Sequence, residues 1–311
     1  MRYNLVVKKV GFIYDDIFLK HGIPDWHPER KDRLVQILNS LKKSGLWEKL
    51  IHIKPCEANY DDIALVHTSA YINKVVNFGT GYLDPDTYMS EDSLKAALYA
   101  AGSLIEAVER CKKGEIERAF CAVRPPGHHA ESNRAMGFCI FNNVAIGARY
   151  AQKIGYKKVF IIDFDVHHGN GTQHIFESDD TVFYFSTHQY LHYPGTGTDA
   201  ERGIGKGKEY TYNVPMPAGS GDKEYLNVYQ NILPDLVKVF EPDITFVSAG
   251  YDIHKNDPLA DIRVSDDGIR EIVHSILSCS QNPFIFALEG GYNLSALGDS
   301  VSITIEEMLK D

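Results

Sequence analysis

Short apolar runs alternate with amphipathic stretches along most of this chain. The runs are predicted as strands because they are rich in β-branched and aromatic residues and are bounded by turns: Val10–Tyr14, Leu50–Ile53, Arg118–Val123, Lys158–Asp163, Val182–Ser186, Thr211–Val214, Asp243–Ser248 and Phe284–Leu288. The intervening stretches have a helical pattern and are predicted as helices: Pro28–Ser44, Ser93–Lys113, Asn143–Lys153, Lys223–Phe240, Ser265–Cys279 and Leu294–Leu309. This alternation indicates an α/β fold with a mainly parallel sheet covered by helices on both faces. No repeat or linker divides the chain, so residues 1–311 are predicted to form a single domain.

Composition narrows the class of protein. Of the 311 residues 44% are hydrophobic and 24% charged, which is ordinary for a soluble globular protein. The net charge of −10 argues against nucleic acid as a partner and suits cationic substrates. No apolar run is long enough to span a membrane, and Met1–Val10 lacks the apolar core of a signal peptide. The five cysteines have neither metal-site nor redox spacing, so we expect reduced thiols and a cytoplasmic location.

The end of the predicted strand Lys158–Asp163 carries the most informative chemistry. Asp163, Asp165 and His167 alternate along the chain, so they would project from the same side of an extended segment. Two carboxylates and an imidazole suit a metal ion. The alternative interpretation is an acidic helix cap beside a histidine that is satisfied by hydrogen bonds.

Asp252 is the candidate for a third metal ligand. It follows the predicted strand Asp243–Ser248, and functional sites in open α/β sheets lie at the carboxyl ends of strands. With Asp165 and His167 it would provide three protein ligands and leave room for water and substrate, as in catalytic zinc sites. The alternative is an aspartate that only caps a loop.

Two further strand ends carry candidate catalytic groups. His128 and His129 follow a Pro-Pro-Gly segment that holds them on a rigid loop, and they could act in acid–base catalysis near neutral pH. Tyr292 follows Glu289-Gly290-Gly291, and its phenol could stabilise an oxyanion. Each could instead be a structural residue, and only the convergence of the strand ends favours the catalytic interpretation.

Three other segments give weaker signals. Gly203–Lys208 lacks the Gly-Lys-Ser/Thr ending of a nucleotide-binding loop and is predicted to be a surface turn. Leu191–Gly197 could be an aromatic loop beside a pocket or a plain turn. Asp84-Pro85-Asp86 could contribute to an acidic rim, although turn formation explains it equally well.

Together these segments resemble the histone deacetylase family, with its bacterial deacetylase-like, acetoin-utilisation and acetylpolyamine amidohydrolase members. The resemblance covers nearly the whole chain and is carried by Gly11–Tyr14, His27–Arg30, Arg124–His129, Gly137–Asn143, Asp163–Gly171, Pro194–Gly197 and Glu289–Tyr292. It implies the arginase/deacetylase fold, with a central parallel sheet of about eight strands. Asn170, where class I enzymes have aspartate, makes the resemblance class II-like.

The resemblance assigns roles to individual residues. Asp165, His167 and Asp252 match the ligands of one Zn²⁺, with Fe²⁺ as the alternative metal. The residues that match catalytic groups are His129 as general base, His128 as its companion, Asp163 behind His128, Asn170 behind His129, and Tyr292 as oxyanion donor. Gly137, Phe138, Tyr193 and Leu259 match the substrate tunnel, Arg30 matches an arginine of the inner cavity, and a structural K⁺ is expected around Asp163 and Ser186.

The implied reaction is metal-assisted hydrolysis of an amide. We expect acetylated or otherwise acylated lysines of proteins and peptides as substrates, and small acetylated amines such as acetylpolyamines as the alternative. Polyamine specialists of one type carry Glu seven residues after the third zinc ligand, where this chain has Leu259. A two-manganese, arginase-like site is disfavoured because it would need Asp at Gly169, and a non-enzymatic acyl-binding role has no support in the residues. The oligomeric state stays open.

Overall fold

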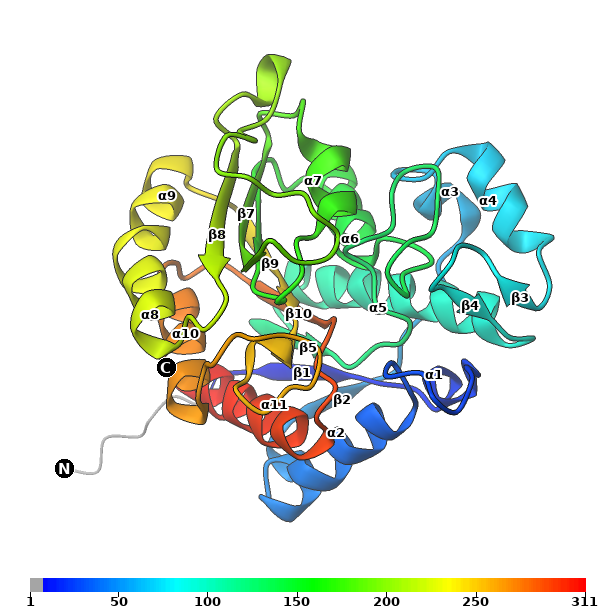
Figure 1. Ribbon diagram of the computed structural model, residues 1–311, viewed down its shortest axis with the longest axis horizontal. Helices are drawn as coiled ribbons and strands as arrows, with labels where there is room; N and C mark the ends of the chain where they lie inside the picture. The colour runs from blue at the N-terminus through cyan, green and yellow to red at the C-terminus, as the bar shows by residue number, and fades with distance from the viewer. Residues whose placement is uncertain (1–7) are drawn as a thin grey trace.

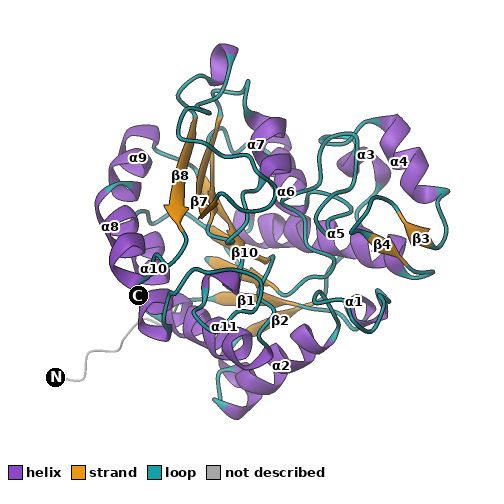
Figure 2. Cartoon of the chain, in the orientation of Figure 1, coloured by secondary structure: helices purple, strands orange, loops and turns teal. Residues whose placement is uncertain are grey.

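Eight parallel strands form the central sheet of residues 8–311, the part of the chain that this computed structural model describes (Figures 1 and 2). The spatial order is β2-β1-β5-β10-β9-β6-β7-β8, and all neighbouring strands pair in parallel. The strands are β1 (Val10–Ile13), β2 (Ile51–Ile53), β5 (Arg118–Cys121), β6 (Val159–Asp163), β7 (Val182–Tyr190), β8 (Thr211–Pro217), β9 (Ile244–Ala249) and β10 (Phe284–Leu288). The predicted α/β fold and the number of strands are confirmed.

Helices cover both faces of the sheet (Figure 1). One layer contains α2 (Asp32–Lys43), α8 (Asp222–Asn231), α9 (Leu233–Phe240), α10 (Asp266–Ser278) and α11 (Leu294–Leu309). The other contains α1 (Ile17–Lys20), α3 (Tyr60–Ile63), α5 (Ser93–Lys112), α6 (Asn143–Lys153) and α7 (Asn170–Phe176). Strands β5, β6, β9 and β10 are buried along their whole length because helices pack on both sides, which explains their continuous apolar sequences.

The sheet order places four loops side by side. Strands β5, β10, β9 and β6 are consecutive neighbours in the middle of the sheet. Because they are parallel, their carboxyl ends meet at one edge. The segments that begin at Arg124, Glu289, Gly250 and Phe164 therefore converge although they are far apart in sequence.

The elements differ from the prediction in several places. The predicted helix Lys223–Phe240 is two helices, because the chain turns at Ile232 and Pro234 then stands in the first turn of α9. The hairpin of β3 (Gly81–Tyr82) and β4 (Tyr88–Met89) and the helix α4 (Ser69–Val76) were not predicted. Residues 1–7, within the stretch on which the signal-peptide expectation rests, lie outside the described part. Among residues 8–311, no helix has the length and apolar character needed to cross a membrane.

Candidate active site

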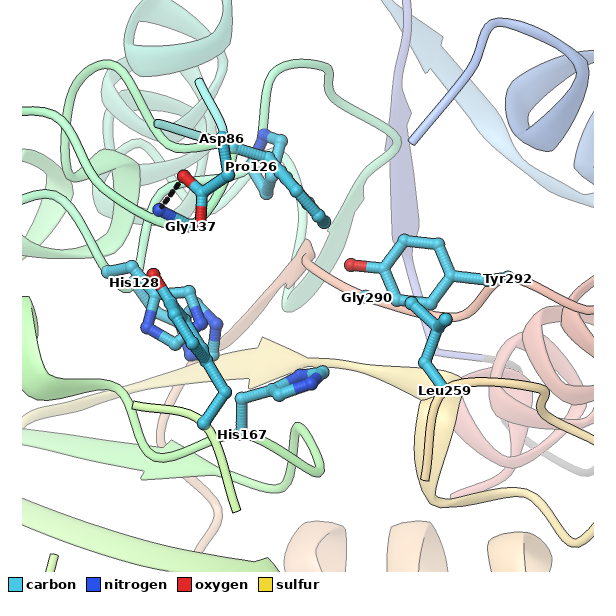
Figure 3. Close-up of a pocket in the computed structure, with 11 residues that line it drawn as sticks. Asp86, Pro126, His128, Gly137, His167, Leu259, Gly290 and Tyr292 are labelled. Carbon is cyan, nitrogen blue, oxygen red and sulfur yellow. Dashed lines mark hydrogen bonds between the residues drawn. The ribbon is translucent and has the colours of Figure 1, made fainter. Parts of the chain in front are cut away.

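A cavity of about 180 Å³ opens where the central strands end (Figure 3). Residues from the loops after β5, β6, β7, β9 and β10 line it, together with one residue from the β3–β4 turn. The lining residues are Asp86, Pro126, His128, His129, Gly137, Phe138, His167, Tyr193, Leu259, Gly290 and Tyr292. The sequence-predicted tunnel residues Gly137, Phe138, Tyr193 and Leu259 are all among them.

The three predicted metal ligands lie together, and one of them, His167, lines this cavity. One ligand atom from each of Asp165, His167 and Asp252 lies within 4.8 Å of the others. His167 Nδ1 is 3.0 Å from Asp165 Oδ1 and 3.3 Å from Asp252 Oδ2. Backbone N–H groups fix the carboxylates from behind: Val166 donates to Asp252 and Gly290 donates to Asp165. The side chains are thus pre-positioned around one point.

The chemistry of this cluster fits a bound cation. Asp252 is fully buried, and its Oδ2 has no hydrogen-bond partner among residues 8–311. Burial, reinforced by the charge of Asp165, raises the pKa of Asp252 to about 7. Burial alone would lower the pKa of His167, but the hydrogen bonds and negative charges of Asp165 and Asp252 have the larger effect and raise it to about 10. Without a metal ion, the protonated imidazole is therefore the favoured form. Two carboxylates and one imidazole are a donor set for Zn²⁺ or Fe²⁺.

Two glycines make room for the carboxylates. A Cβ at Gly250 would lie 2.0 Å from Asp165 Oδ2, and a Cβ at Gly290 would lie 1.9 Å from Asp252 Oδ2. Any side chain at these strand ends would therefore displace a ligand. From the sequence, Gly290 was named only as part of the motif before Tyr292 and Gly250 had no assigned role, because the close approach is visible only in the structure.

His128 and His129 have opposite electrostatic environments. The carboxylates of Asp163 and Asp165 overcome the effect of burial and raise the pKa of His128 to about 10, and Nδ1 of His128 lies 3.0 Å from Asp163 Oδ2. Burial lowers the pKa of His129 well below its ordinary value, and the neighbouring imidazoles of His128 and His167 lower it further. These environments favour the cationic form of His128 and the neutral form of His129, and a neutral imidazole is the form that can accept a proton as a base.

Tyr292 faces the histidines across the cavity, with its hydroxyl directed into the open space (Figure 3). Its backbone N–H donates to Asp257 Oδ2 over 2.6 Å, and the Arg33 guanidinium lies 5.1 Å from its ring centroid. Phe138 packs edge-to-face against the ring of Tyr292, with centroids 6.2 Å apart. A hydroxyl group therefore stands opposite the two adjacent histidines, in the cavity that His167 also lines.

Asp86 is a site residue that sequence analysis left undecided. Its Oδ1 accepts a hydrogen bond from Gly137 N at 2.9 Å (Figure 3), while Asp84 caps the turn by accepting from Thr87 N. Asp84 thus has the turn-forming role, and Asp86 places a carboxylate on the cavity wall. The spacing of the two aspartates could not separate these roles because both fit an Asx turn.

The expectation for Arg30 is wrong. Its side chain is 47% exposed and pairs with Asp32 at the surface. Arg33, one turn further along, is 1% exposed, bonds to Glu29, and donates to the carbonyl oxygen of Gly291 over 2.7 Å. Arg33 and Arg124 are both fully buried, and both bond to the carboxylate of Glu29.

The predicted potassium position lies behind the metal ligands. Asp163 and Ser186 face each other as register partners in β6 and β7, and both are fully buried. Ser186 Oγ is 2.9 Å from His188 Nδ1, and Asp163 accepts from the Tyr184 hydroxyl. Potassium binding there stays a prediction.

Fold and site together define an α/β protein with a buried Asp-His-Asp cluster that could hold a metal ion, and a pair of adjacent histidines, at the carboxyl edge of a parallel sheet. The histone deacetylase domain model matches residues 27–308, and the chain belongs to this family. A probable deacetylase of Methanothermobacter thermautotrophicus is 42% identical over 88% of the chain and 83% of its own length. Histone deacetylase 5 of Arabidopsis thaliana is 37% identical over 98% of the chain but only 49% of its own length. The chain thus spans about half of this plant relative and most of the archaeal one.

The solved structures include a crystal structure of the HDA15 HD domain that matches this fold closely. It has a TM-score of 0.93 and 37% sequence identity, and the match covers 97% of this chain and 91% of that one. The resemblance stated from the motifs is therefore confirmed for the family and the fold.

Proposed function

We propose that this protein is a zinc-dependent deacetylase that hydrolyses the amide of acetyl-lysine, or of another acyl-lysine, to a free amine and a carboxylate. One observation carries this proposal: the buried Asp165–His167–Asp252 cluster adjoins a cavity that His167, His129 and Tyr292 line together. When bound there, Zn²⁺ would supply a Lewis acid and lower the pKa of a water molecule toward about 7. Iron(II) is compatible with the same ligands.

The side chains of this protein would perform the proton transfers. His129 is neutral, so it can accept the proton of the attacking water and then return it to the departing amine. Tyr292 would donate a hydrogen bond to the oxygen of the tetrahedral species. His128, held cationic by Asp163, would supply positive charge beside them.

The cavity walls favour an extended, apolar substrate arm. Phe138 and Tyr193 are rings on the wall, and Leu259 lies at the same cavity without a charge. The methylene chain of acyl-lysine would fit between such walls, with its acyl group at the metal cluster. This is why lysine amides of proteins or peptides are the first choice of substrate.

Acetylpolyamines are the second candidate because Asp86 places a carboxylate on the wall of the cavity. A carboxylate there could attract the distal ammonium of a polyamine. Leu259, where one type of polyamine specialist has glutamate, argues for lysine instead. We also propose a cytoplasmic location, which is supported by the five free cysteines.

The test is to measure kcat/KM of the zinc-loaded protein for an acetyl-lysine peptide, longer acyl-lysine peptides and N8-acetylspermidine. We expect turnover of the peptides to exceed that of the polyamine. Asp252→Asn keeps the shape of the side chain but should reduce bound zinc well below one per chain and abolish turnover. Asp61→Asn, at an exposed carboxylate of α3, is the matched control. Full zinc content in Asp252→Asn would exclude Asp252 as a ligand, and preference for the polyamine would reverse the order of the two substrates.

A further inference from the structure

A carboxylate lies one hydrogen bond behind the general-base candidate. Asn170 stands between His129 and Glu131: its Oδ1 is 2.8 Å from His129 Nδ1, and its Nδ2 donates to Glu131 Oε1 over 2.6 Å. All three residues are buried. No role was assigned to Glu131 from the sequence, and the site described above does not use it.

The position of Glu131 decides how the Asn170 amide is oriented. A carboxylate accepts hydrogen bonds and has none to donate, so the NH₂ group of Asn170 must face Glu131. Its carbonyl oxygen then faces His129 Nδ1, which must carry the ring proton in order to donate to it. The remaining nitrogen, Nε2 of His129, is thereby left as the acceptor.

Glu131 is itself held in place from several sides. Its backbone N–H donates to Arg134 O, and its carbonyl oxygen lies 3.0 Å from His67 Nδ1. Oε1 also lies 2.9 Å from His174 Nδ1, on the partly exposed side of α7. The carboxylate therefore has a fixed position, and the Arg134 guanidinium lies 3.7 Å from its Oε1.

We propose that Glu131 is a positioning residue for the deacetylase reaction: through Asn170 it selects the tautomer of His129 in which Nε2 can accept a proton. The inference rests on the proposed function, because it assumes that His129 is the general base. An amide can present either its oxygen or its NH₂ group to an imidazole. The Asn170 NH₂ group also lies 3.4 Å from His129 O and 3.5 Å from Met136 Sδ, but Glu131 Oε1 at 2.6 Å is the nearest of these three acceptors and the charged one. Glu131 therefore contributes most to fixing this orientation.

The first test compares two substitutions at Glu131. In Glu131→Met the acceptor is lost, and kcat should fall by about 10- to 100-fold with KM little changed, the range for removing a group that orients a ligand or base. In Glu131→Gln the amide oxygen can replace Oε1 as acceptor for both Asn170 and His174, so most of this kcat should be retained. Glu91→Met, at an exposed carboxylate outside the cavity, is the matched control. Equal losses in the Met and Gln variants, or no loss in either, would overturn the proposal.

The second test exchanges the carboxylate and the amide group between positions 131 and 170. Asn170→Asp alone places two carboxylates where the structure has a 2.6 Å hydrogen bond, and should lower kcat by at least about 10-fold through repulsion. In the double variant Glu131→Gln/Asn170→Asp, the glutamine NH₂ can donate to the new carboxylate at position 170, which still accepts from His129. Recovery of at least about 10-fold relative to Asn170→Asp is expected. Additive losses would contradict a shared hydrogen-bond chain.

A third measurement separates failure of this inference from failure of the proposed function. Nitrogen-15 NMR of the imidazoles should show His129 protonated at Nδ1 in the wild type and as a tautomer mixture in Glu131→Met, whatever reaction the protein catalyses. The imidazole resonances that are absent from the spectrum of a His129→Gln variant are assigned to His129. If the wild type has no deacetylase activity but Glu131→Met still changes the tautomer of His129, the proposed function is rejected and the positioning role is kept. If the wild type is active and Glu131→Met leaves the tautomer unchanged, the positioning role is rejected.

Discussion

Among single residues, Tyr292 offers the most specific test of the proposed chemistry. Its ring is fixed by Phe138 and Arg33 and its backbone by Asp257, so Tyr292→Phe removes the hydroxyl while these contacts remain. We expect kcat for an acetyl-lysine peptide to fall by about 10²- to 10³-fold, the cost of losing one oxyanion donor. Steady-state kinetics and zinc content measured together check this, since zinc should stay at one per chain.

Tyr225→Phe is the matched control for this prediction. Tyr225 is fully buried, lies outside the lining of the cavity, and its hydroxyl has no hydrogen-bond partner within residues 8–311. Its removal should leave kcat nearly unchanged. If Tyr292→Phe behaved like Tyr225→Phe, Tyr292 would not be the oxyanion donor.

Sequence motifs predicted the positions of some site residues and misplaced another. Strand alternation was the basis for placing Asp165 and His167 on one side, but β6 ends at Asp163. It is the loop after the strand that brings both residues to Asp252. The inner arginine was misplaced, because Arg30 is the last residue of the motif His27–Arg30 and Arg33 lies only three residues beyond it. The signal that separates them is the spacing of Glu29 and Arg33, which are four residues apart and form a buried ion pair.

At the scale of elements, the ends of β9 and β10 leave no space for a side chain beside the carboxylates of Asp165 and Asp252, and this can be tested. In Gly290→Ala the new Cβ would lie 1.9 Å from Asp252 Oδ2 and 2.6 Å from Asp165 Oδ2, so both carboxylates must move. We expect zinc content well below one per chain and loss of activity, while the melting temperature of the metal-free protein changes little. Elemental analysis and thermal unfolding check the two parts.

Gly11→Ala provides the control for crowding in a strand. There the added Cβ would lie 2.9 Å from Ile116 Cδ1 and from Ile53 Cδ1, which are ends of flexible apolar side chains in the core. This variant should lose some thermal stability but keep its zinc. Full zinc content in Gly290→Ala would show that the carboxylates can rearrange and that the glycine is not needed for the site.

The core strands could be predicted from the sequence because they are buried on both faces. Each predicted core strand is an apolar run, because helices cover both faces of a parallel sheet, and each is found where it was predicted. Strands β7 and β8, however, continue to Tyr190 and Pro217, beyond the predicted ends at Ser186 and Val214. The two-residue strands β3 and β4 carry no such pattern, so their hairpin was missed and the location of Asp86 with it. The break between α8 and α9 was missed because the apolar period continues across Pro234.

At the scale of the whole molecule, the order of the strands assembles the site. Sequence could predict that loops after parallel strands share one edge, but not that β5, β10, β9 and β6 are neighbours. That order depends on contacts between segments far apart in the chain, such as the pairing of Phe284–Ala287 with Arg118–Cys121. The family resemblance supplied what local patterns could not.

The stability of the whole molecule should depend on pH through His67, a buried residue remote in sequence from the metal ligands. Nδ1 of His67 lies 3.0 Å from the carbonyl oxygen of Glu131, and Nε2 accepts from Asn142 N at 2.9 Å, so both ring nitrogens are used by the neutral form. Burial lowers the pKa of His67 from 6.5 to about 4, although the bond to Glu131 partly opposes this. The unfolded chain therefore takes up a proton near pH 6.5 that the folded protein accepts only near pH 4. His67 favours folding fully above pH 6.5, and this contribution is lost as the pH falls toward 4, by at most about 3 kcal/mol.

The measurement is urea unfolding of the wild type and of His67→Gln at several pH values between 7 and 4.5. Glutamine can donate and accept in the same directions but does not titrate, so the wild type should lose stability relative to His67→Gln as the pH falls. The difference between the two proteins isolates His67, because other buried groups such as Asp252 and Glu289 have raised pKa values and titrate in the same range. His52→Gln, at an exposed histidine of β2, is the matched control. Parallel stability curves for the wild type and His67→Gln would show that His67 takes up its proton equally in the folded and unfolded states, and that its buried hydrogen bonds do not favour the neutral ring.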